Sequence, residues 1–464
     1  MTSGNARSFQ ADSADYRAKV DTRAFLQSSL TGYATRRQVR QSTFRTWEKA
    51  RDAASAIKAE AVENLDRYLP EFIERAEARG IKIFVAKDGE RARQEVIRII
   101  TEKEARCVVK AKSMTGEEIH LSHALEKIGL EVIESDLGEF IVQLREEAPF
   151  HIVFPSMHLR RGEIQKLFAE KIGQGAGVSD DPSSLTMDAR RALRQKYIEA
   201  DIGITGVNFG IAETGQIALC TNEGNGRLTT SLPRTHIALM GIEKIVPKLS
   251  DLSLLLPMLA TAGAAQHLTG YTTILGGPRD KDEIDGPEEM HLILMDNGRS
   301  TLLADVEQRD ALQCIRCGAC LNVCPIYKNV GGHTYGTTYQ GPIGSVITPH
   351  LRGLQDWKDL SQASSLCGAC TATCPVKIDL HHHLLHNRRN AMAERPVWWE
   401  RWALRAFAAL ASRTTLYRIG ARLGRLGHQL GRWMVPAWSR TRELPKLPRQ
   451  SFSDWWENHD TNRS

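Results

Sequence analysis

The stretch that decides the fold is CIRCGACLNVCP, which runs from Cys314 to Pro325. Its four cysteines follow the spacing C-x2-C-x2-C-x3-C-P, which binds cubane iron–sulfur clusters. The first three thiolates can surround one cluster in a tight loop, and Gly318 allows close approach of the backbone there. The fourth cysteine, one helical turn further on, points the other way and predicts a ligand to a second cluster.

A second run, LCGACTATCP at 366–375, repeats this motif without its first cysteine, and Ser364 stands at the missing position. In two-cluster ferredoxin motifs the last cysteine of each run ligates the cluster of the other run. This crossing predicts the first cluster on Cys314, Cys317, Cys320 and Cys374, and the second cluster on Cys324, Cys367 and Cys370.

The second cluster therefore has three predicted thiolates and an open fourth corner. It is either a three-iron cluster, or a four-iron cluster whose last iron binds Ser364, water or a remote group. Cys107 and Cys220 are remote candidates, but each lies in an apolar run that predicts a buried, unreactive thiol. A zinc ribbon would have two C-x2-C pairs without the x3-C-P endings, so the array favours iron.

Length and composition exclude several classes of protein. A chain of 464 residues predicts two or three domains, and 42% hydrophobic with 25% charged residues is typical of globular proteins. The sequence contains no apolar stretch long enough to span a membrane and begins without the apolar core of a secretory signal. We therefore expect a cytoplasmic protein, in which clustered cysteines bind metal rather than form disulfides.

The residues before the cysteines predict helices followed by an α/β domain. Residues 1–70 carry apolar side chains at helical spacing. Further on, helical patterns separate short apolar runs that predict buried strands, and this alternation predicts a parallel sheet. The predicted strands are IKIFVA (81–86), RCVVKAKS (106–113), LEVIESD (130–136) and HIVFP (151–155), and the glycine-bounded runs after residue 201 predict added hairpins.

Polar side chains gather among glycines between residues 203 and 227. A pocket for a small anion needs such groups, but tight hairpins need the same residue types, so both interpretations stay open. The candidate residues are Asn208, Glu213, Thr214, Asn222, Glu223, Asn225 and Arg227. The GQGAG run at 173–177 lacks the preceding strand of a dinucleotide fingerprint, so no motif predicts a flavin or nicotinamide site.

The C-terminal segment has a composition of its own. Twelve arginines and two acidic residues lie between Arg388 and Arg442, and seven of the nine tryptophans follow residue 390. Periodicity predicts helices there, followed by an extended tail from Glu443. We favour docking of these helices on a partner protein over contact with an anionic membrane surface. Nucleic acid is a poorer ligand because the rest of the chain is net acidic.

A histidine run, His381–His383 with His386, follows the second cysteine motif on a predicted helix. Side chains at adjacent helical positions spread around the helix and cannot converge on one metal. We therefore expect a solvated or partner-facing surface.

Together these motifs resemble the lactate utilization protein B group, iron–sulfur subunits of a bacterial L-lactate oxidation system. KSMTGEE at 112–118 and the stretch 203–227 look like its lactate-utilization domain, which is related in fold to sugar-phosphate isomerase-like α/β proteins. Residues 305–385 resemble an α-helical two-cluster ferredoxin domain. The expected parts are a helical segment (1–70), an α/β domain (71–300), a ferredoxin domain (301–390) and a basic helical extension with a tail (391–464).

The resemblance implies two 4Fe–4S clusters on the seven cysteines named above, with the fourth ligand of the second cluster unassigned. It also implies two companion proteins, one with cysteine-rich CCG motifs and one with a shorter lactate-utilization domain. The implied function is electron transfer in the oxidation of L-lactate to pyruvate, which allows growth on lactate. The alternative is that this chain is itself the catalyst and binds the hydroxy acid at the open iron or in the 203–227 loops. A redox sensor is a third reading, disfavoured by the lack of a DNA-binding motif.

Overall fold

A computed structural model describes residues 9–173, 175–395, 398–434, 448 and 450–460. The chain divides into two compact units, Met1–Ala391 and Met392–Ser464. The boundaries expected at residues 70 and 300 lie inside the first unit and stay predictions.

A six-stranded sheet forms the centre of the first unit, with all neighbouring strands parallel. The predicted parallel α/β domain is thus confirmed. The strand order β1-β10-β7-β4-β2-β3 places the most apolar strands in the middle, where both faces are covered. The strands are β1 (Lys82–Ala86), β10 (Glu289–Met295), β7 (Thr235–Gly241), β4 (Ile202–Gly206), β2 (Cys107–Lys110) and β3 (Glu131–Glu134).

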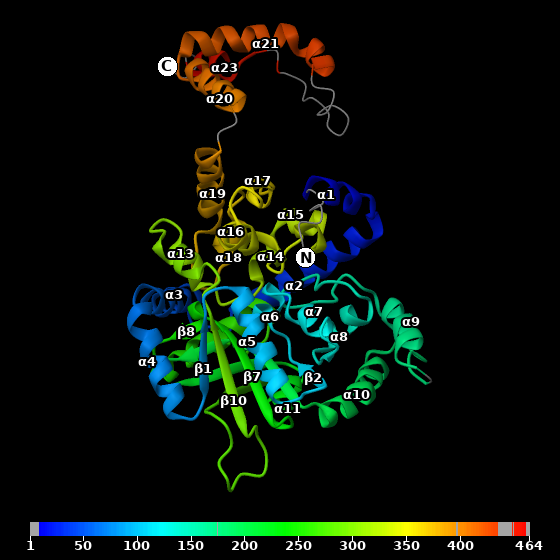
Figure 1. Ribbon diagram of the computed structural model, residues 1–464. Helices are drawn as coiled ribbons and strands as arrows, with labels where there is room; N and C mark the ends of the chain where they lie inside the picture. Colours follow the sequence, from blue (N-terminus) through cyan, green and yellow to red (C-terminus); the bar gives the residue numbers. More distant parts are fainter. Residues whose placement is uncertain (1–8, 174, 396–397, 435–447, 449, 461–464) are drawn as a thin grey trace. The chain divides into compact units, whose positions relative to one another are not determined.

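Helices and a second sheet cover the two faces (Figure 1). On one face α5 (Gly89–Glu102) and α7 (Leu121–Glu126) bury a continuous apolar core against the strands. On the other face lie α4 (Leu65–Ala78) and a small mixed sheet. The mixed sheet has the order β8 (Ile245–Val246), β5 (Phe209–Ile211), β6 (Gln216–Thr221) and β9 (Tyr271–Leu275).

The β5–β6 hairpin confirms one of the hairpins expected after residue 201. Its turn passes so close to α4 that a Cβ on Gly215, at φ +69°, would lie 2.4 Å from the backbone nitrogen of Ala76. Only glycine fits a turn with that conformation and that clearance.

The strand predicted at 151–155 is wrong. These residues form a loop in which Phe150 N–H donates to the carbonyl of Pro155 at 2.9 Å. The ring Nδ1 of His151 accepts hydrogen bonds from the backbone of Val153 and Phe154, at 3.0 and 3.2 Å. Local partners therefore replace the strand ladder, and the apolar side chains pack on the cysteine region instead.

The predicted N-terminal helices are confirmed over the described residues as α1 (Phe9–Ala18), α2 (Val20–Gln41), α3 (Trp47–Glu63) and α4. Helices α2 and α3 pack over the cysteine region. Leu26 and Leu30 of α2 are fully buried in the same apolar core as Cys317 and Leu384. Burial of each such leucine stabilises the fold by about 2 kcal/mol.

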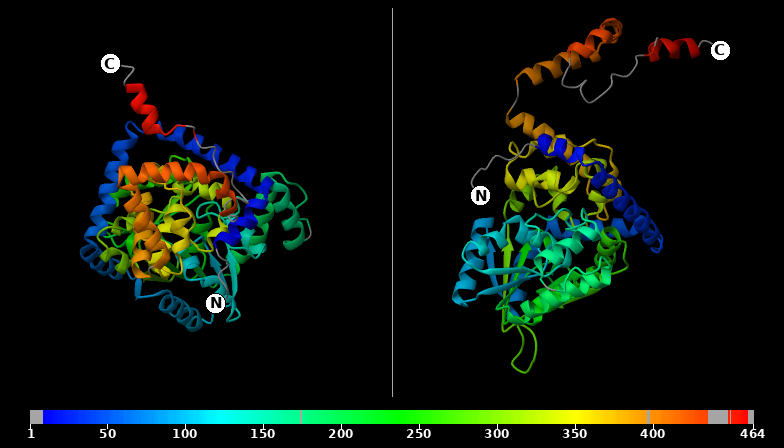
Figure 2. Two further views of the ribbon diagram at one scale, coloured as in Figure 1. Left: turned by 90° about the horizontal axis from the view of Figure 1, so that it is seen from above. Right: turned by 90° about the vertical axis from the view of Figure 1, so that its right-hand side faces the viewer.

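The cysteine region is helical, as predicted, and lies across one end of the sheet in Figure 1 and in the right view of Figure 2. Its main helices are α14 (Ala319–Val323), α15 (Pro325–Val330), α16 (Gly341–Arg352), α17 (Lys358–Gln362), α18 (Ala369–Thr373) and α19 (Leu380–Glu394). The remaining helices of the unit are α6 (Met114–Glu118), α8 (Leu137–Leu144), α9 (Arg161–Lys171), α10 (Pro182–Glu199), α11 (Asn225–Ser231), α12 (Leu252–Ala264) and α13 (Arg299–Ala304).

The second unit contains α20 (Trp398–Ala411), α21 (Thr414–Met434) and α23 (Phe452–Asp460). The extended tail expected from Glu443 is wrong for 452–460, where the chain is helical, while 443–447 and 449 lie outside the described residues. Across the described helices, none combines the length and the apolar character that crossing a bilayer would need.

Candidate metal centres

The two cysteine loops have the same backbone conformation. Arg316 precedes Cys317 and Leu366 precedes the equivalent Cys367, with φ of +60° and +56°, and Gly318 and Gly368 follow these cysteines at +74° and +76°. A five-residue helix then begins in each loop, α14 in the first and α18 in the second. The sequence repeat is therefore also a repeat of the fold.

The cysteines gather in two groups that combine residues of both loops. One small cavity is lined by Cys314, Cys317 and Cys320 of the first loop together with Cys374 of the second. For the other three, burial raises the pKa values of Cys324 and Cys370, with Cys367 adding to both and Cys324 adding to that of Cys370, so they lie near one another. We name these sets the first and second thiol groups; the crossing of the motifs predicts the same sets, and their role as cluster ligands stays a prediction.

The thiols are poor acids in this arrangement. Burial, and to a lesser extent the nearby Cys314, raises the pKa of Cys374 to about 12. Burial raises the pKa of Cys370 to about 11 and lifts that of Cys320 well above its usual value. Buried thiols in such proximity are held as thiolates when metal cations compensate their charge. The donor set thus fits iron–sulfur clusters.

The second thiol group is the more exposed one. In the first group Cys314 is partly buried and the other three are buried, whereas in the second Cys370 is buried, Cys324 is partly buried and Cys367 is exposed. Only the second group therefore has an exposed cysteine among the described residues.

Ser364 occupies the place that Cys314 has in the first loop. The backbone N–H of Leu366 donates to Ser364 Oγ at 3.1 Å, and that of Arg316 donates to Cys314 Sγ at 3.4 Å. The serine oxygen and the cysteine sulfur therefore make the same local contact, two residues upstream of the donor.

Basic side chains lie near the first thiol group, and no sequence motif predicts them: Arg51 and Lys58 are buried, Arg37 is partly buried, and burial lowers the pKa of Lys58 to about 7. Arg51 of α3 donates from Nε to the carbonyl of Cys374 at 2.9 Å. Lys58 of α3 donates to the carbonyls of Glu243 and Ile245 at 2.8 and 3.1 Å. Arg37 of α2 is close enough for its pKa to respond to the charges of the cysteines. These side chains come from distant parts of the chain, so only the fold brings them together.

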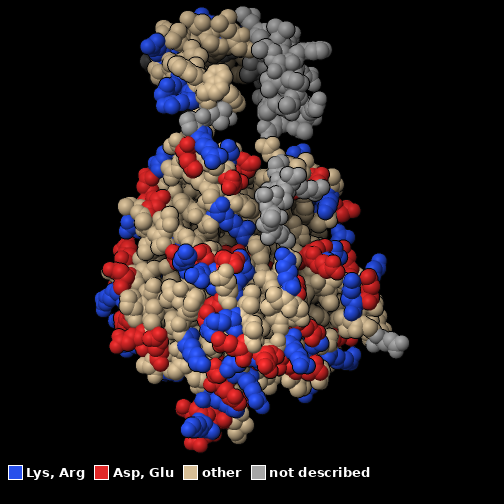
Figure 3. Space-filling model, viewed as in Figure 1, with Lys and Arg blue, Asp and Glu red and all other residues tan. Residues whose placement is uncertain are grey.

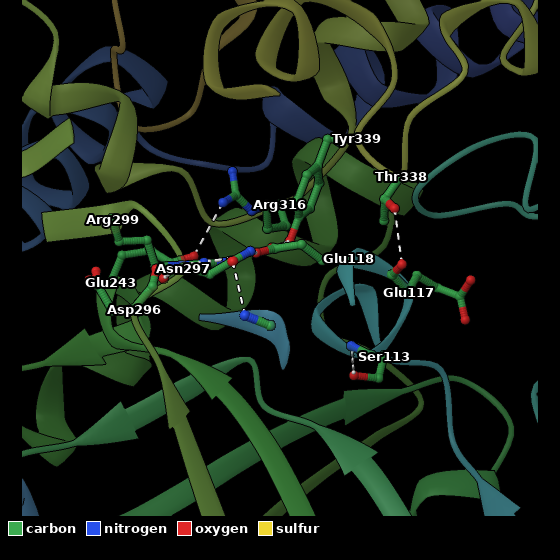
Figure 4. A network of polar contacts seen from close by, with 12 residues as sticks. Ser113, Glu117, Glu118, Glu243, Asp296, Asn297, Arg299, Arg316, Thr338 and Tyr339 are labelled. Carbon is green, nitrogen blue, oxygen red and sulfur yellow. Dashed lines mark hydrogen bonds and ion pairs between the residues drawn. The ribbon is translucent and has the colours of Figure 1, made fainter. Parts of the chain in front are cut away.

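A buried ionic network ties Arg316 of the first loop to the sheet (Figure 4). Arg299 contacts Glu243 at 2.5 Å and Glu118 at 2.8 Å, and Arg316 Nη2 contacts Glu243 at 3.2 Å. Tyr339 donates to Glu118 at 2.6 Å. Burial opposes ionisation of Glu243, but the two arginines outweigh it and lower the pKa of Glu243 to about 2. The first loop is thereby held to the end of the sheet by paired charges.

A cavity of about 970 Å³ lies between the sheet and the first loop. Four candidates of the 203–227 stretch line it, namely Asn208, Asn222, Glu223 and Asn225, together with Arg316 and Cys317. Glu213, Thr214 and Arg227 are not among the lining residues, and Glu213 instead accepts a hydrogen bond from Leu249 N–H at 2.9 Å. A pocket for a small anion therefore stays a prediction, and Asn208 also accepts a hydrogen bond from Cys220 N–H of the hairpin at 2.8 Å.

The two remaining cysteines lie outside both thiol groups. Cys107 is buried in the core beneath α10, as expected. Cys220 is partly buried and lines the large cavity, and burial raises its pKa to about 12.

The surface expected for the histidine run is wrong at one position. His382 is exposed, but His383 is buried, with Nε2 2.7 Å from the carboxylate of Asp310. His381 bonds Thr371 at 2.8 Å. The helix α19 packs one side on the core, so adjacent histidines have different surroundings.

Comparison with known protein families matches three models along the chain. The LUD domain matches residues 69–295, the 4Fe-4S dicluster domain matches 310–378, and the model "Lactate utilisation protein B, C-terminal" matches 381–461.

Curated relatives match nearly the whole chain. Lactate utilization protein B 2 of Bacillus mycoides is 43% identical over 448 residues, and lactate utilization protein B of Bacillus cytotoxicus is 44% identical over 448 residues. Each match covers 94% of both chains. A crystal structure of a DUF162 family protein from Deinococcus radiodurans matches 50% of this chain and 98% of its own length. The sequence identity is 15% and the TM-score is 0.28, so we draw no conclusion from this match. On the strength of the matches to the curated relatives, the chain belongs to the lactate utilization protein B family.

Proposed function

We propose that this chain is an iron–sulfur electron-transfer subunit that takes part in the oxidation of L-lactate to pyruvate and so allows growth on lactate. The observation that carries the proposal is the pair of thiol groups built from two interleaved loops. Such clusters lie close together and exchange single electrons, which suits a relay. The names of the relatives and the match to a dicluster domain support the role in lactate utilization and electron transfer.

The proposed ligands follow the two thiol groups. The first cluster, a 4Fe–4S cluster, binds to the four cysteines of the first group, and the second binds to Cys324, Cys367 and Cys370. For the second cluster we propose a 4Fe–4S centre with Ser364 Oγ on its fourth iron. The equivalent contacts of Ser364 and Cys314 support this choice. Water at that iron, or a 3Fe–4S cluster, are the alternatives.

Replacing Ser364 tests the ligand assignment. In anaerobically purified protein we expect about eight iron atoms per chain, with acid-labile sulfide in equal amount. Ser364→Cys should change the EPR spectrum of the second cluster only, whereas the neighbouring exposed Ser365→Cys should leave both spectra unchanged. If Ser364→Cys leaves the EPR spectrum unchanged, Ser364 is not next to the fourth iron of the second cluster.

Partners and location form part of the proposal. Electrons pass between this cytoplasmic chain and two companion lactate-utilization proteins, one with CCG motifs and one with a shorter lactate-utilization domain. Helices α20 and α21 expose large apolar side chains beside arginines, with Trp398 73% exposed and Phe407 69% exposed. We assign this surface to docking on a companion protein, and peripheral contact with the inner face of the membrane is the second choice.

Charge on the first unit agrees with a protein partner. On the face seen in Figure 3, lysines and arginines are interspersed with acidic residues over the described part of that unit. Nucleic-acid binding proteins instead gather basic residues in one patch.

The second candidate function is catalysis by this chain itself. The large cavity lined by residues of the 203–227 loops favours it, as does the exposure of Cys367 beside the open corner. EPR spectra of the isolated chain with and without L-lactate separate the two functions. A relay predicts spectra that lactate leaves unchanged until the companion proteins are added, whereas catalysis predicts a lactate-dependent change in the isolated chain.

A further inference from the structure

Three metal-ligating side chains meet at the start of α19, outside both thiol groups. Asp379 directly precedes this helix, and His381 and His382 lie in its first turn. Each of the three residues offers one ligand atom, and these atoms lie within 4.8 Å of one another. We name the three residues the α19 cluster. The spread of adjacent helical positions thus separates His383, which faces Asp310, but it does not separate His381 from His382.

The carboxylate of Asp379 lies between the two imidazoles of the cluster. Its Oδ2 is 2.6 Å from Nδ1 of His382, and its Oδ1 is 3.1 Å from Nδ1 of His381. The two rings have centroids 4.1 Å apart and an interplanar angle of 37°. The backbone carbonyl of Asp379 accepts from His383 N–H at 3.2 Å, so the first turn of the helix holds this residue beside the two rings.

One oxygen of this carboxylate lacks a hydrogen bond. Asp379 Oδ1 is buried and has no donor among the described residues, although Nδ1 of His381 is close to it. That nitrogen instead contacts the hydroxyl of Thr371 in α18 at 2.8 Å. A buried carboxylate oxygen without a donor is unfavourable unless a proton or a cation compensates its charge.

The spacing and the types of these atoms fit a zinc ion. Zinc binds imidazole nitrogen and carboxylate oxygen at about 2.0–2.2 Å, so tetrahedral ligand atoms lie about 3.3 Å from one another. The nitrogen–oxygen distances of 2.6 and 3.1 Å need only small side-chain shifts to reach that spacing. Calcium and magnesium prefer oxygen ligands, so two imidazoles favour zinc over either of them.

We propose that the α19 cluster binds one zinc ion, with His381, His382 and Asp379 as protein ligands and water in the fourth position. The side chains of His382 and Asp379 are 55% and 46% exposed, so the ion and the water reach the site from solvent. Thr371 keeps a partner when the ring of His381 binds the ion, because the backbone N–H of His381 also donates to its hydroxyl, at 3.2 Å.

The electrostatics and the chemistry of the ion agree with this site. The positive end of a helix opposes a cation only weakly, and a carboxylate with two imidazoles outweighs that effect. Zinc has no redox chemistry, so the ion fixes the first turn of α19 and carries no electrons. The site therefore does not depend on the electron-transfer function.

Zinc binding is tested on the full chain without an affinity tag, purified without oxygen, loaded with iron and washed with a chelator. Zinc chloride is titrated in and the heat of binding is measured. We expect one zinc per chain, with a Kd of about 1 µM or below, and binding about tenfold or more weaker in His382→Gln and in Asp379→Asn. His386→Gln is the matched control, because His386 lies on the same helix outside the cluster. His382→Gln changes an exposed side chain, so it guards against failure of Asp379→Asn to fold.

X-ray absorption at the zinc edge identifies the ligand atoms. We expect nitrogen and oxygen neighbours at about 2.0–2.1 Å and no sulfur neighbour at about 2.3 Å. Sulfur neighbours, or loss of iron as zinc is taken up, would place the zinc at the thiol groups and overturn the site. Binding only at millimolar zinc would show an adventitious ion only. That result, or equal affinity in the variants and the control, would overturn the proposal as well.

Discussion

The two cysteine loops have the same backbone conformation but differ in the burial and the charges of their surroundings. Both have a residue near φ +60° before the equivalent cysteines, Cys317 and Cys367, and a glycine after them. The first loop, however, lies under α2 and α3 among basic side chains, while the second leaves Cys367 exposed and has serine where the first has cysteine. The motif thus sets how thiolates can meet a cluster, and the surroundings set its charge environment and access. We expect the first cluster to have the higher reduction potential, because nearby cations favour the added electron.

Loss of a ligand should separate the loops most strongly. Cys320→Ala removes a buried ligand and part of the core shared with α2, whereas Cys367→Ala changes an exposed position. Each variant should lose about half of the iron. Loss of either cluster removes metal-binding stability, but Cys320→Ala also disturbs the core shared with α2, so it should lower the thermal midpoint by several degrees more than Cys367→Ala does. Iron assays measure the metal loss and thermal scans the midpoints, and equal midpoints in the two variants would contradict the comparison.

The ionic network should matter next. Glu243→Gln leaves Arg299 and Arg316 without their shared carboxylate, and breaking a buried ion pair costs about 3–5 kcal/mol. Glu48→Gln is the matched control, because its partner contact to Arg51 involves an exposed carboxylate and should contribute less than about 1 kcal/mol. Chemical denaturation measures the free energy of unfolding of both variants. Equal stability of the two variants would contradict a stabilising role of the buried network.

Acid should weaken the contact between the 150–155 loop and the first cysteine loop. Burial lowers the pKa of His151 to about 3, while Nε2 bonds Asn322 at 3.0 Å. The unfolded chain takes up this proton near pH 6.5 and the folded chain does not, so stability is full above that pH and falls as pH drops toward 3. Between about pH 7.5 and about pH 5.5 the loss is about 1.4 kcal/mol.

His151→Gln should remove that part of the pH dependence. The free energies of unfolding at the two pH values, compared between wild type and variant, give the contribution directly. An unchanged difference would show that His151 does not titrate in this way.

The smallest effect is expected in the second loop. Arg388 donates to the carbonyls of Ser361 and Ser364, at 2.9 and 2.7 Å, and so holds the start of this loop. Arg388→Gln should cost about 1 kcal/mol and speed the loss of the second cluster in air. The adjacent Arg389→Gln removes exposed contacts to Glu307 and Asn390 and should change neither quantity. Iron release followed by absorbance distinguishes them.

Much of the architecture could be read from local patterns. The apolar runs of β1, β2 and β3 predicted the parallel sheet, and the cysteine spacing predicted both thiol groups, because periodicity and loop geometry are local properties. The prediction of a strand at 151–155 was wrong because backbone N–H groups there donate to the ring of His151. A hydrophobic pattern does not reveal such a contact.

The surroundings of the site could not be predicted in this way. Arg37, Arg51 and Lys58 reach the first thiol group from helices that lie more than 250 positions earlier in the chain. Only tertiary packing brings them there. In the 203–227 stretch the same residue types serve turns and cavity walls, so the sequence could not tell which of them would line the cavity.

The close approach between α12 and the first cysteine loop has a consequence for dissection of the protein. A Cβ on Gly263 would lie 2.7 Å from the carbonyl oxygen of Cys317, so this helix directly abuts the loop. Leu26, Leu255 and Leu384, from three distant segments, belong to the same apolar core. A fragment limited to residues 301–390 would expose that core to water. The cluster-binding segment is therefore not expected to fold on its own. A chimera that exchanges this segment between relatives must also include α2 and α12.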